Sequence, residues 1–531
     1  MAKTVVDALV AALAEMGVRR MFGIPGGGSS LDVMEAGAKA GIDFVLARTE
    51  SAAAMMAAAT AELSGAPGII LTGLGPGAAN ATNGVAYAQL DRAPLLIVTD
   101  RFDDAESYVT HQAVAHDRLF GAVVKASRTL RAGDGVAEVA SLLRLAMAHP
   151  QGAVHIDLSS KQAGAPAGVH VTTPAAPEPG LDEAALAKAR SLLAGARKPA
   201  ILVGVQARED AAAVRGFAAA LNCPVFVTFK AKGIVSDDDP LTIGLVTGGT
   251  AEAPCLAEAD LHILYGFDPI ELIPQRWRFK APIIELGRVQ GLAHYKTPDV
   301  SLIGPLAASV TALGGANRAS SWAAEELAAH KAAYRARMAP HRSKDGLGAV
   351  EVVEAAQRAA PADTRMTVDA GAHMFAAMTL WRAREANGAL ISNGLSTMGL
   401  SLPAAIASAL HEPSRPVVAF TGDGGLMMCL GDLATAAEQG CRIAVVVLND
   451  AALSLIDVKQ QKRGLPVRGV RYPRADFAQV ARALGCRGAV ATTAGQVESA
   501  VAEAIAGSGP MLIDAHVDPA PYSAHVDALR A

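Results

Sequence analysis

Two aspartates in the last quarter of the chain have the residue type and spacing of a metal site. Asp423 lies in the glycine-rich run 422–425, directly after an apolar segment, and Asp450 follows a second apolar segment 27 residues further on. The pattern predicts a strand, helix, strand unit, in which the carboxyl ends of two parallel strands meet at one edge of a sheet. Two carboxylates placed together repel each other unless a cation lies between them, and Mg2+ prefers such oxygen ligands.

The glycine-rich run itself is suited to an anion. Gly422, Gly424 and Gly425 let backbone N–H groups approach a diphosphate at the start of the helix that we expect over 426–439. The run and the two aspartates together predict a metal-bridged diphosphate as the ligand. The alternative is an ordinary strand, helix, strand unit with a glycine turn.

This stretch resembles the GDG…NN signature of the thiamine diphosphate (ThDP) enzymes, with Asp450 in place of the second Asn. The resemblance implies that Asp423 and Asp450 give side-chain oxygens to Mg2+ and that Ala452 gives its carbonyl oxygen. It also implies a cofactor that carries the difficult chemistry while the protein orients it.

Glu50 is the candidate catalytic carboxylate, at the start of an alanine-rich helix expected over 50–64. A glutamate in a first helical turn most often stabilises the helix dipole. In the resembling enzymes, however, a glutamate after an RHE-like turn contacts N1' of the cofactor's aminopyrimidine. Its carboxyl group there promotes the tautomer whose N4' removes the proton from thiazolium C2.

Two further segments match the same enzymes. The segment 73–99, GLGPGAANATNGVAYAQLDRAPLLIVT, resembles their GPGATN…A..D..P motif and places Pro76 and Asn80 at the cofactor. The segment 391–410 resembles SGGLGTMGxGLPAAIGAAL. It implies that the backbone of Ser396 accepts a hydrogen bond from the cofactor amine and that Met398 wedges between the two cofactor rings. Core filling is the alternative for Met398.

Three weaker candidates complete the expected site. Ala372 and His373 match a GQH segment near the diphosphate, and His111 with Gln112 falls where these enzymes often place a glutamine facing the reacting carbon. A loop histidine is often only a solvated surface residue. The run 26–28, Gly-Gly-Gly, could supply N–H groups to an oxyanion or form only a turn.

The elements that must position these residues alternate between strand-like and helical patterns. We expect strands at 20–24, 43–47, 67–72, 94–99 and 153–157 in the first unit, and at 199–204, 224–228, 261–265 and 282–286 in the second. Linkers are expected at 171–180 and 337–346. The fold class is therefore α/β, with three doubly wound parallel-sheet domains: 1–170 binding the pyrimidine, 182–335 central, and 346–531 binding the diphosphate and Mg2+.

Composition favours an enzyme of small molecules. The 531 residues are 51% hydrophobic and 18% charged, with a formal net charge of -4, which gives no reason to expect nucleic acid or an anionic membrane as partner. The five cysteines have no CxxC spacing, and neither a signal peptide nor a membrane-spanning run is present. We expect a cytoplasmic protein.

The central segment resembles acetolactate synthase and pyruvate oxidase but departs from the synthases at two positions. Gly266 stands where they carry an arginine associated with the second 2-oxo acid, and Lys459 stands in place of a tryptophan. No FAD motif is evident, so FAD is doubtful. Lys459, Lys462 and Arg463 could meet an anionic substrate or form a solvated helix end.

The resemblance as a whole is to the acetolactate synthase, pyruvate oxidase and benzoylformate decarboxylase group of ThDP enzymes. It implies a ThDP- and Mg2+-dependent 2-oxo acid decarboxylase or carboligase, acting on a 2-oxo acid or aldehyde. Alternatives are a pyruvate oxidase type, a benzaldehyde lyase or acyl-CoA lyase type, or a catalytically silent binding protein of the same fold. It also implies a homodimer or homotetramer with active sites between subunits.

Overall fold

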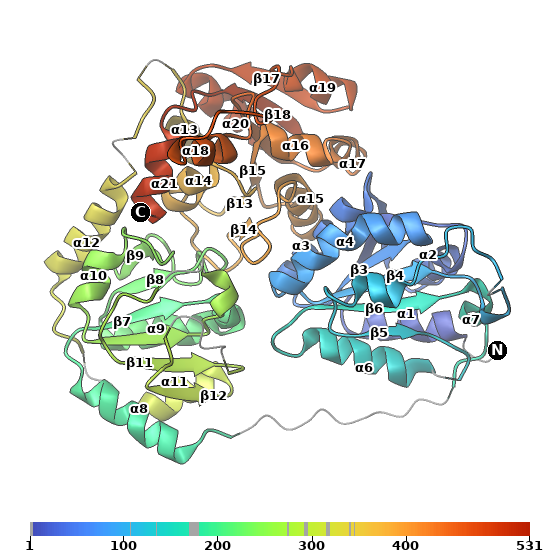
Figure 1. The fold of residues 1–531 in the computed structure, drawn as a ribbon, viewed down its shortest axis with the longest axis horizontal. Coiled ribbons are helices and arrows are strands. Elements are labelled where there is room, and N and C mark those ends of the chain that lie inside the picture. Colours follow the sequence, from blue (N-terminus) through green and yellow to red (C-terminus); the bar gives the residue numbers. More distant parts are fainter. Residues whose placement is uncertain are drawn as a thin grey trace.

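The chain forms three lobes, each built on one sheet, in a computed structural model (Figure 1). Each sheet has six strands, and every pairing between these strands is parallel. Helices flank the sheets, so the expected α/β fold with three doubly wound parallel sheets is confirmed. The structure describes residues 4–106, 108–133, 135–168, 180–272, 276–290, 296–314, 319–338, 341–344 and 346–530.

The domain boundaries stay a prediction. Most of the expected linker at 171–180 lies outside the described residues, as do three positions of the second linker at 337–346.

The first sheet has the strand order β2-β1-β3-β4-β6-β5, so the direction of winding changes between β1 and β3. Its inner strands are apolar and buried on both faces, as expected where helices cover a parallel sheet. The elements are β1 (Arg20–Ile24), β2 (Asp43–Leu46), β3 (Gly68–Thr72), β4 (Leu95–Asp100), β5 (Ser127–Thr129), β6 (Ala153–Leu158), α1 (Val5–Glu15), α2 (Ser29–Lys39), α3 (Glu50–Ser64), α4 (Gly75–Leu90), η1 (Asp104–Glu106), α5 (His116–Phe120), α6 (Gly135–Met147) and α7 (Ser160–Ala163).

The second sheet has the order β12-β11-β10-β7-β8-β9, with its change of direction between β7 and β10. The elements are β7 (Pro199–Val203), β8 (Val225–Val227), β9 (Thr242–Leu245), β10 (Leu261–Tyr265), β11 (Ile283–Gly287), β12 (Val300–Ile303), α8 (Glu183–Gly195), η2 (Val205–Asp210), α9 (Ala211–Leu221), α10 (Ala253–Glu258), η3 (Pro269–Glu271), α11 (Leu306–Leu313) and α12 (Ala324–Ala336).

The third sheet has the order β14-β13-β15-β16-β18-β17, with its change of direction between β13 and β15. The elements are β13 (Arg365–Val368), β14 (Ala389–Ile391), β15 (Val417–Gly422), β16 (Ile443–Asn449), β17 (Arg487–Ala491), β18 (Met511–His516), α13 (Ala349–Ala359), α14 (Met374–Leu380), α15 (Ser401–His411), α16 (Asp423–Cys429), α17 (Asp432–Glu438), α18 (Ser454–Lys462), α19 (Phe477–Ala483), α20 (Ala494–Ala506) and α21 (Tyr522–Arg530).

One expected element is wrong. The single helix predicted over 426–439 is two helices, α16 and α17, and α16 begins three residues earlier, at Asp423. The break lies at Gly431, where a Cβ atom would be 3.0 Å from the Cβ of Arg48. The Asp432 carboxylate accepts the Arg48 backbone N–H at 2.9 Å, so docking of the first lobe interrupts the helix.

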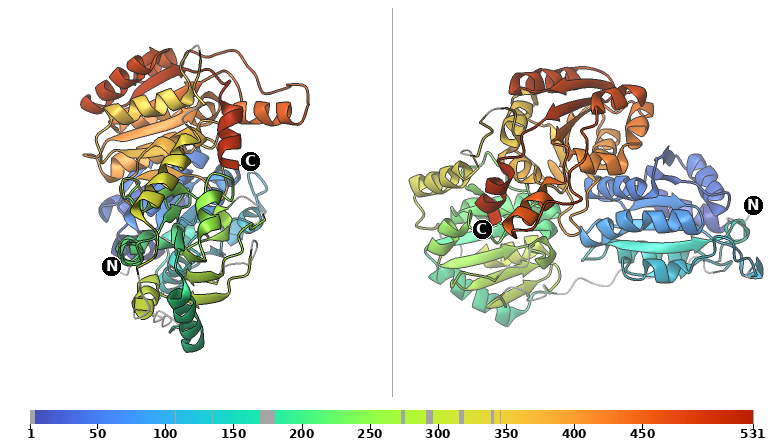
Figure 2. Two further views of the ribbon diagram at one scale, coloured as in Figure 1. Left: turned by 90° about the vertical axis from the view of Figure 1, so that its left-hand side faces the viewer. Right: turned by 45° about the horizontal axis from the view of Figure 1, so that its top comes forward.

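The first and third lobes share one apolar core. Buried residues of α3 and α4 pack with those of α15 and β15, and these helices face one another between the two sheets (Figure 1). Turning the molecule shows the second lobe beside both of them (Figure 2). The loops at the carboxyl ends of the strands are therefore carried on a packed scaffold.

Candidate active site

Glu50 begins α3, as expected. Its neighbour Thr49 caps the helix, accepting the Ala52 N–H at 3.1 Å through its hydroxyl. The Glu50 carboxylate accepts a hydrogen bond from the Asn80 side-chain amide of α4 at 2.5 Å. The close approach of these helices depends on Gly84, since a Cβ there would lie 2.4 Å from the backbone oxygen of Ser51.

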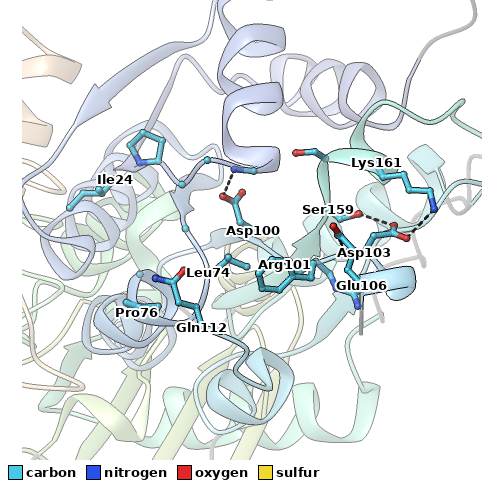
Figure 3. Close-up of a pocket in the computed structure, with 18 of the residues that line it drawn as sticks. Ile24, Leu74, Pro76, Asp100, Arg101, Asp103, Glu106, Gln112, Ser159 and Lys161 are labelled. Carbon is cyan, nitrogen blue, oxygen red and sulfur yellow. Dashed lines mark hydrogen bonds and ion pairs between the residues drawn. The ribbon is translucent and has the colours of Figure 1, made fainter. Parts of the chain in front are cut away.

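A cavity of about 740 Å³ opens beside Glu50, at the point between β1 and β3 where the first sheet changes direction (Figure 3). Ligands of doubly wound sheets bind at such points. Pro76 and Gln112 line it, whereas His111 does not. Gln112 has φ 58°, a strained value for a residue other than glycine. The other lining residues are Ile24, Pro25, Gly26, Gly27, Gly28, Glu50, Gly73, Leu74, Gly77, Asp100, Arg101, Phe102, Asp103, Ala105, Glu106, Ser159, Ser160 and Lys161.

The Asp100 carboxylate of the same chain lies at the glycine run 26–28. Asp100, at the end of β4, accepts the Gly28 N–H at 3.1 Å and the Ser30 N–H at 2.7 Å, and both serine hydroxyls at Ser29 and Ser30 donate to it. Asp100 thus neutralises the start of α2. Sequence reasoning missed this residue, although its position directly after an apolar strand was a usable signal.

The aspartate pair lies on the third lobe, after the neighbouring strands β15 and β16. Asp423 accepts the Ala451 N–H at 2.6 Å and the Gly424 N–H at 2.7 Å. Asp450 accepts the Ala452 N–H at 3.2 Å and the Ser454 hydroxyl at 2.5 Å. Ala451 has φ 62°, so the turn that aims this loop at Asp423 is strained.

The electrostatics of this pair favour a cation. Burial raises the pKa of Asp423, and burial with repulsion from Asp423 raises the pKa of Asp450 to about 7 against the hydrogen bond from Ser454. Two neighbouring carboxylates with raised pKa values are stabilised in their ionised form by a divalent ion that takes both as ligands.

The glycine loop after β15 forms a narrow cradle. A Cβ atom at Gly424 would lie 2.6 Å from Leu453 Cδ2 and 3.5 Å from Met398 Cε, and one at Gly422 would lie 3.4 Å from the His373 ring. Met398 and His373 therefore flank the loop. Ser396, two residues before Met398, has φ 54°.

An orphaned polar atom points to a ligand at the cradle. His373 is 4% exposed, and its Nε2 has no hydrogen-bond partner among the residues that the structure describes. Burial lowers the pKa of His373 to about 4, so the ring is neutral at pH 7 and can donate from one nitrogen. Ala372 beside it is buried as well. The donors and acidic ligands present fit a diphosphate held with a divalent cation.

Two residues of this half-site were not predicted. The Tyr472 hydroxyl donates to Asp423 at 2.8 Å, and Asp369, after β13, accepts the Thr421 hydroxyl at 2.6 Å and the Ser401 N–H at 2.7 Å. Tyr472 comes from a segment 49 residues after Asp423 that has no recognisable motif. Only tertiary packing brings it to the site.

Another cluster with metal-binding residue types is largely hydrogen-bonded within the chain, although His116 Nε2 is buried without a hydrogen-bond partner among the described residues. His116 Nδ1 lies 2.7 Å from Asp157 Oδ1, and the Thr99 hydroxyl lies 2.5 Å from the same oxygen and 2.8 Å from His155 Nε2. Ser127 bonds the other nitrogen of His155 at 2.7 Å. Burial raises the pKa of Asp157, but hydrogen bonds from both histidines outweigh it and lower that pKa. This network fixes the start of α5 on the sheet.

In the second lobe, the loops at the corresponding change of strand direction touch each other. Gln206 donates its N–H to the Gly266 carbonyl at 2.9 Å. A Cβ atom at Gly204 would lie 2.5 Å from Phe267 Cα, and one at Gly266, where φ is 61°, would lie 2.6 Å from the Ala207 nitrogen. The loops after β7 and β10 are therefore in direct contact.

Fold and site together define an α/β protein with two half-sites, a carboxylate beside a cavity on one lobe and a carboxylate pair beside an anion cradle on another. Models of the thiamine pyrophosphate (that is, thiamine diphosphate) enzyme match this chain: the N-terminal TPP binding domain over residues 3–118, the central domain over 186–313, and the C-terminal TPP binding domain over 369–515. The chain belongs to this enzyme family.

Relatives extend over nearly the whole chain. It is 28% identical to an acetolactate synthase of Bacillus subtilis, over 97% of this chain and 93% of that protein. It is 29% identical to a catabolic acetolactate synthase of Raoultella terrigena, over 96% and 94%, and 28% identical to a pyruvate oxidase of Lactiplantibacillus plantarum, over 96% and 87%. Among the described residues, no helix has the length and apolar character needed to cross a membrane.

Proposed function

We propose that this protein is a ThDP- and Mg2+-dependent enzyme that makes or breaks a C–C bond next to a carbonyl group, acting on a 2-oxo acid as a decarboxylase or carboligase. The observation that carries the proposal is the pair of Asp423, which is buried, and Asp450, which is partly buried, beside a His373 Nε2 that has no hydrogen-bond partner among the described residues. Asp423, Asp450 and the Ala452 carbonyl would hold Mg2+. Gly422, Gly424, Gly425 and His373 would hold the diphosphate.

The bound cofactor supplies a carbon nucleophile and an electron sink. Glu50 holds or gives up a proton at its carboxyl group, in the orientation that Asn80 fixes. Gln112 and Pro76 line the cavity where the substrate lies, and Gln112 orients the substrate's oxygens. Met398 and the backbone of Ser396 shape the floor of the cofactor site.

The reaction is closer to decarboxylation than to acetolactate synthesis. Gly266 places no arginine at the end of β10, and its backbone packs against Ala207. The central segment carries no evident FAD motif, so we propose that the domain binds no FAD, which favours a flavin-free enzyme over a pyruvate oxidase type.

The two half-sites are carried by separate lobes, because every residue lining the cavity comes from 24–161 while the aspartate pair follows β15 and β16. We propose that the chain acts as a homodimer or homotetramer in the cytoplasm, with each active site completed by a second copy. Large apolar side chains near both half-sites are exposed, with Leu31 of α2 at 52% and Met427 and Met428 of α16 each at 57%.

The test is calorimetry of ThDP binding with and without Mg2+. Wild-type protein should bind ThDP only when Mg2+ is present, and Asp423→Ala should lose that binding. Asp476→Asn, a change at an exposed helix cap of the same lobe, should bind as wild type does. Unchanged ThDP affinity in Asp423→Ala would refute the metal assignment. Where the wild-type protein binds ThDP and Mg2+, assays of the loaded enzyme with a panel of 2-oxo acids and aldehydes would identify its reaction.

A further inference from the structure

The cofactor loop 392–398 is held from outside its own lobe. Asp91, which follows α4 of the first lobe, accepts the backbone N–H groups of Asn393 at 2.6 Å, Gly394 at 3.1 Å and Leu395 at 3.3 Å. It also accepts the Ser392 hydroxyl at 2.9 Å. Four donors face one carboxylate that is 2% exposed. Burial raises the pKa of Asp91, although the charge of Lys230 and the hydrogen bond from the Asn393 N–H favour its ionised form.

The second lobe contributes a cation to the base of the same loop. Lys230, in the turn after β8, donates to the Ile391 carbonyl at 3.2 Å and to both oxygens of Glu62 at 2.7 and 2.8 Å. Its Nζ lies 3.8 Å from Asp91 Oδ1, and its side chain is 3% exposed. Arg208 also pairs with Glu62, at 3.2 Å. Two acids and two cations thus form a buried, neutral cluster where the three lobes meet.

The loop also contacts α4 of the first lobe. A Cβ atom at Gly394 would lie 2.2 Å from the Leu90 carbonyl oxygen, so the loop rests directly on the end of α4. Asn83 of the same helix donates to the Thr397 hydroxyl at 3.1 Å. Between these contacts Ser396 takes its positive φ, a conformation that persists only where the surroundings impose it.

We propose that Asp91 and Lys230 are positioning residues for the cofactor, which hold the loop 392–398 from two other lobes so that Ser396 and Met398 present a preformed surface to ThDP. The inference rests on the proposed function. Its physical basis is preorganisation. When the loop is already ordered, the binding of ThDP does not have to offset the free-energy cost of ordering it, so the affinity for ThDP is higher.

A second buried lysine, Lys232, provides a control that distinguishes a positioning role of Lys230 from a purely stabilising one. Lys232 lies two residues after Lys230, is 3% exposed in its side chain and pairs with Asp237 at 2.6 Å, while Asp237 accepts the Ala383 N–H at 2.8 Å rather than a group of the loop. Lys230→Met and Lys232→Met each break a buried ion pair and should both lower the melting temperature. Only Lys230→Met should raise the Kd of ThDP with Mg2+, by tenfold or more.

The second pair of variants is milder, in case the lysine variants do not fold. Asp91→Asn keeps the shape of the side chain but turns an amide toward three N–H groups, whereas Asp237→Asn makes the same change at the control site. Asp91→Asn should raise the Kd of ThDP at least tenfold, measured by calorimetry well below the melting temperature. It should also speed hydrogen exchange at the amides of Asn393, Gly394 and Leu395 in cofactor-free protein.

Equal losses of ThDP affinity in both members of each pair would overturn the positioning role and leave only a structural one. So would unchanged affinity and unchanged exchange in Asp91→Asn. Failure of the proposed function looks different, because wild-type protein would then bind no ThDP while the exchange of the loop amides would still respond to Asp91→Asn.

Discussion

At the scale of single residues, each half-site joins a carboxylate to a partner that orients it. Asn80 donates to Glu50, Tyr472 donates to Asp423, and Ser454 donates to Asp450. A hydrogen bond to a charged carboxylate is stronger than one between neutral groups, so such partners fix the side chain as well as stabilise it. Glu50 differs from the aspartates because it faces an open cavity rather than a second acid.

Glu50→Gln should therefore leave the fold intact and remove proton transfer. The amide cannot exchange a proton with the cofactor, so deuterium exchange at thiazolium C2, followed by NMR, should slow by about 10²- to 10⁴-fold. Glu106→Gln is the matched control, because Glu106 lines the same cavity, where its carboxylate accepts the Asp103 N–H at 3.1 Å. Exchange at the wild-type rate in Glu50→Gln would show that the role given to Glu50 is wrong.

At the scale of elements, the first and third sheets share one strand order and the second has another, although each sheet has one change of strand direction. In the first and third lobes the loops at the change of strand direction carry a cavity and a glycine cradle. In the second lobe they are bound to each other by Glu271. This carboxylate accepts the Val205 N–H at 2.8 Å and the Thr228 hydroxyl, joining segments that follow β7, β8 and β10. Its burial makes the lobe sensitive to pH.

Burial raises the pKa of Glu271 to about 7, against the hydrogen bond from Thr228. In the unfolded chain a glutamate titrates near pH 4.3, so between about pH 4.3 and 7 the folded state binds more protons and stability falls as pH rises. Over this pH range the ionisation of this one group lowers the free energy of unfolding by about 4 kcal/mol. Thermal unfolding should therefore show a larger drop in melting temperature from pH 5 to pH 8 in wild type than in Glu271→Gln.

The control for this pH series is Glu183→Gln, at an exposed glutamate of α8, which should keep the wild-type dependence on pH. If Glu271→Gln loses as much melting temperature between pH 5 and pH 8 as wild type does, the ionisation of Glu271 does not govern the stability of the second lobe.

At the scale of the whole molecule, the fold divides the chemistry between lobes. The cavity beside Glu50 is lined by one lobe alone, and the aspartate pair belongs to another. The two lobes of one chain pack through α3, α4 and α15, with their buried apolar side chains facing one another. In a two-fold dimer every contact of the interface occurs twice. A second copy can therefore bring its aspartate pair to the cavity of the first copy, while the first copy brings its aspartate pair to the cavity of the second.

Mixed assemblies test this division. Glu50→Gln and Asp423→Ala should each be inactive alone, but a mixed dimer would contain one active site with neither substitution. Co-expression should therefore restore about a quarter of the wild-type activity, because half of the dimers are mixed and each has one intact site. Purified variants mixed without exchange of subunits provide the control. No recovery in verified mixed dimers would place each active site within a single chain.

The sequence by itself determined the three parallel sheets and the two acidic sites. A hydrophobic run that ends in glycine or in an acidic residue marks the carboxyl end of a buried strand. In a parallel sheet these ends lie at the same edge, whatever the details of packing. Glu50, Asp423 and Asp450 were accessible to this logic because each stands directly after such a run or begins a helix.

Tertiary structure alone decided how the loops between these elements are held. The split of the expected helix at Gly431, the capping of α2 by Asp100 and the contact of Tyr472 with Asp423 all join residues far apart in the chain. Periodicity reports which face of an element is buried but not which distant group packs there. Asp91 shows the same limit: the sequence places it in a motif, but only packing reveals that it holds a loop 300 residues away.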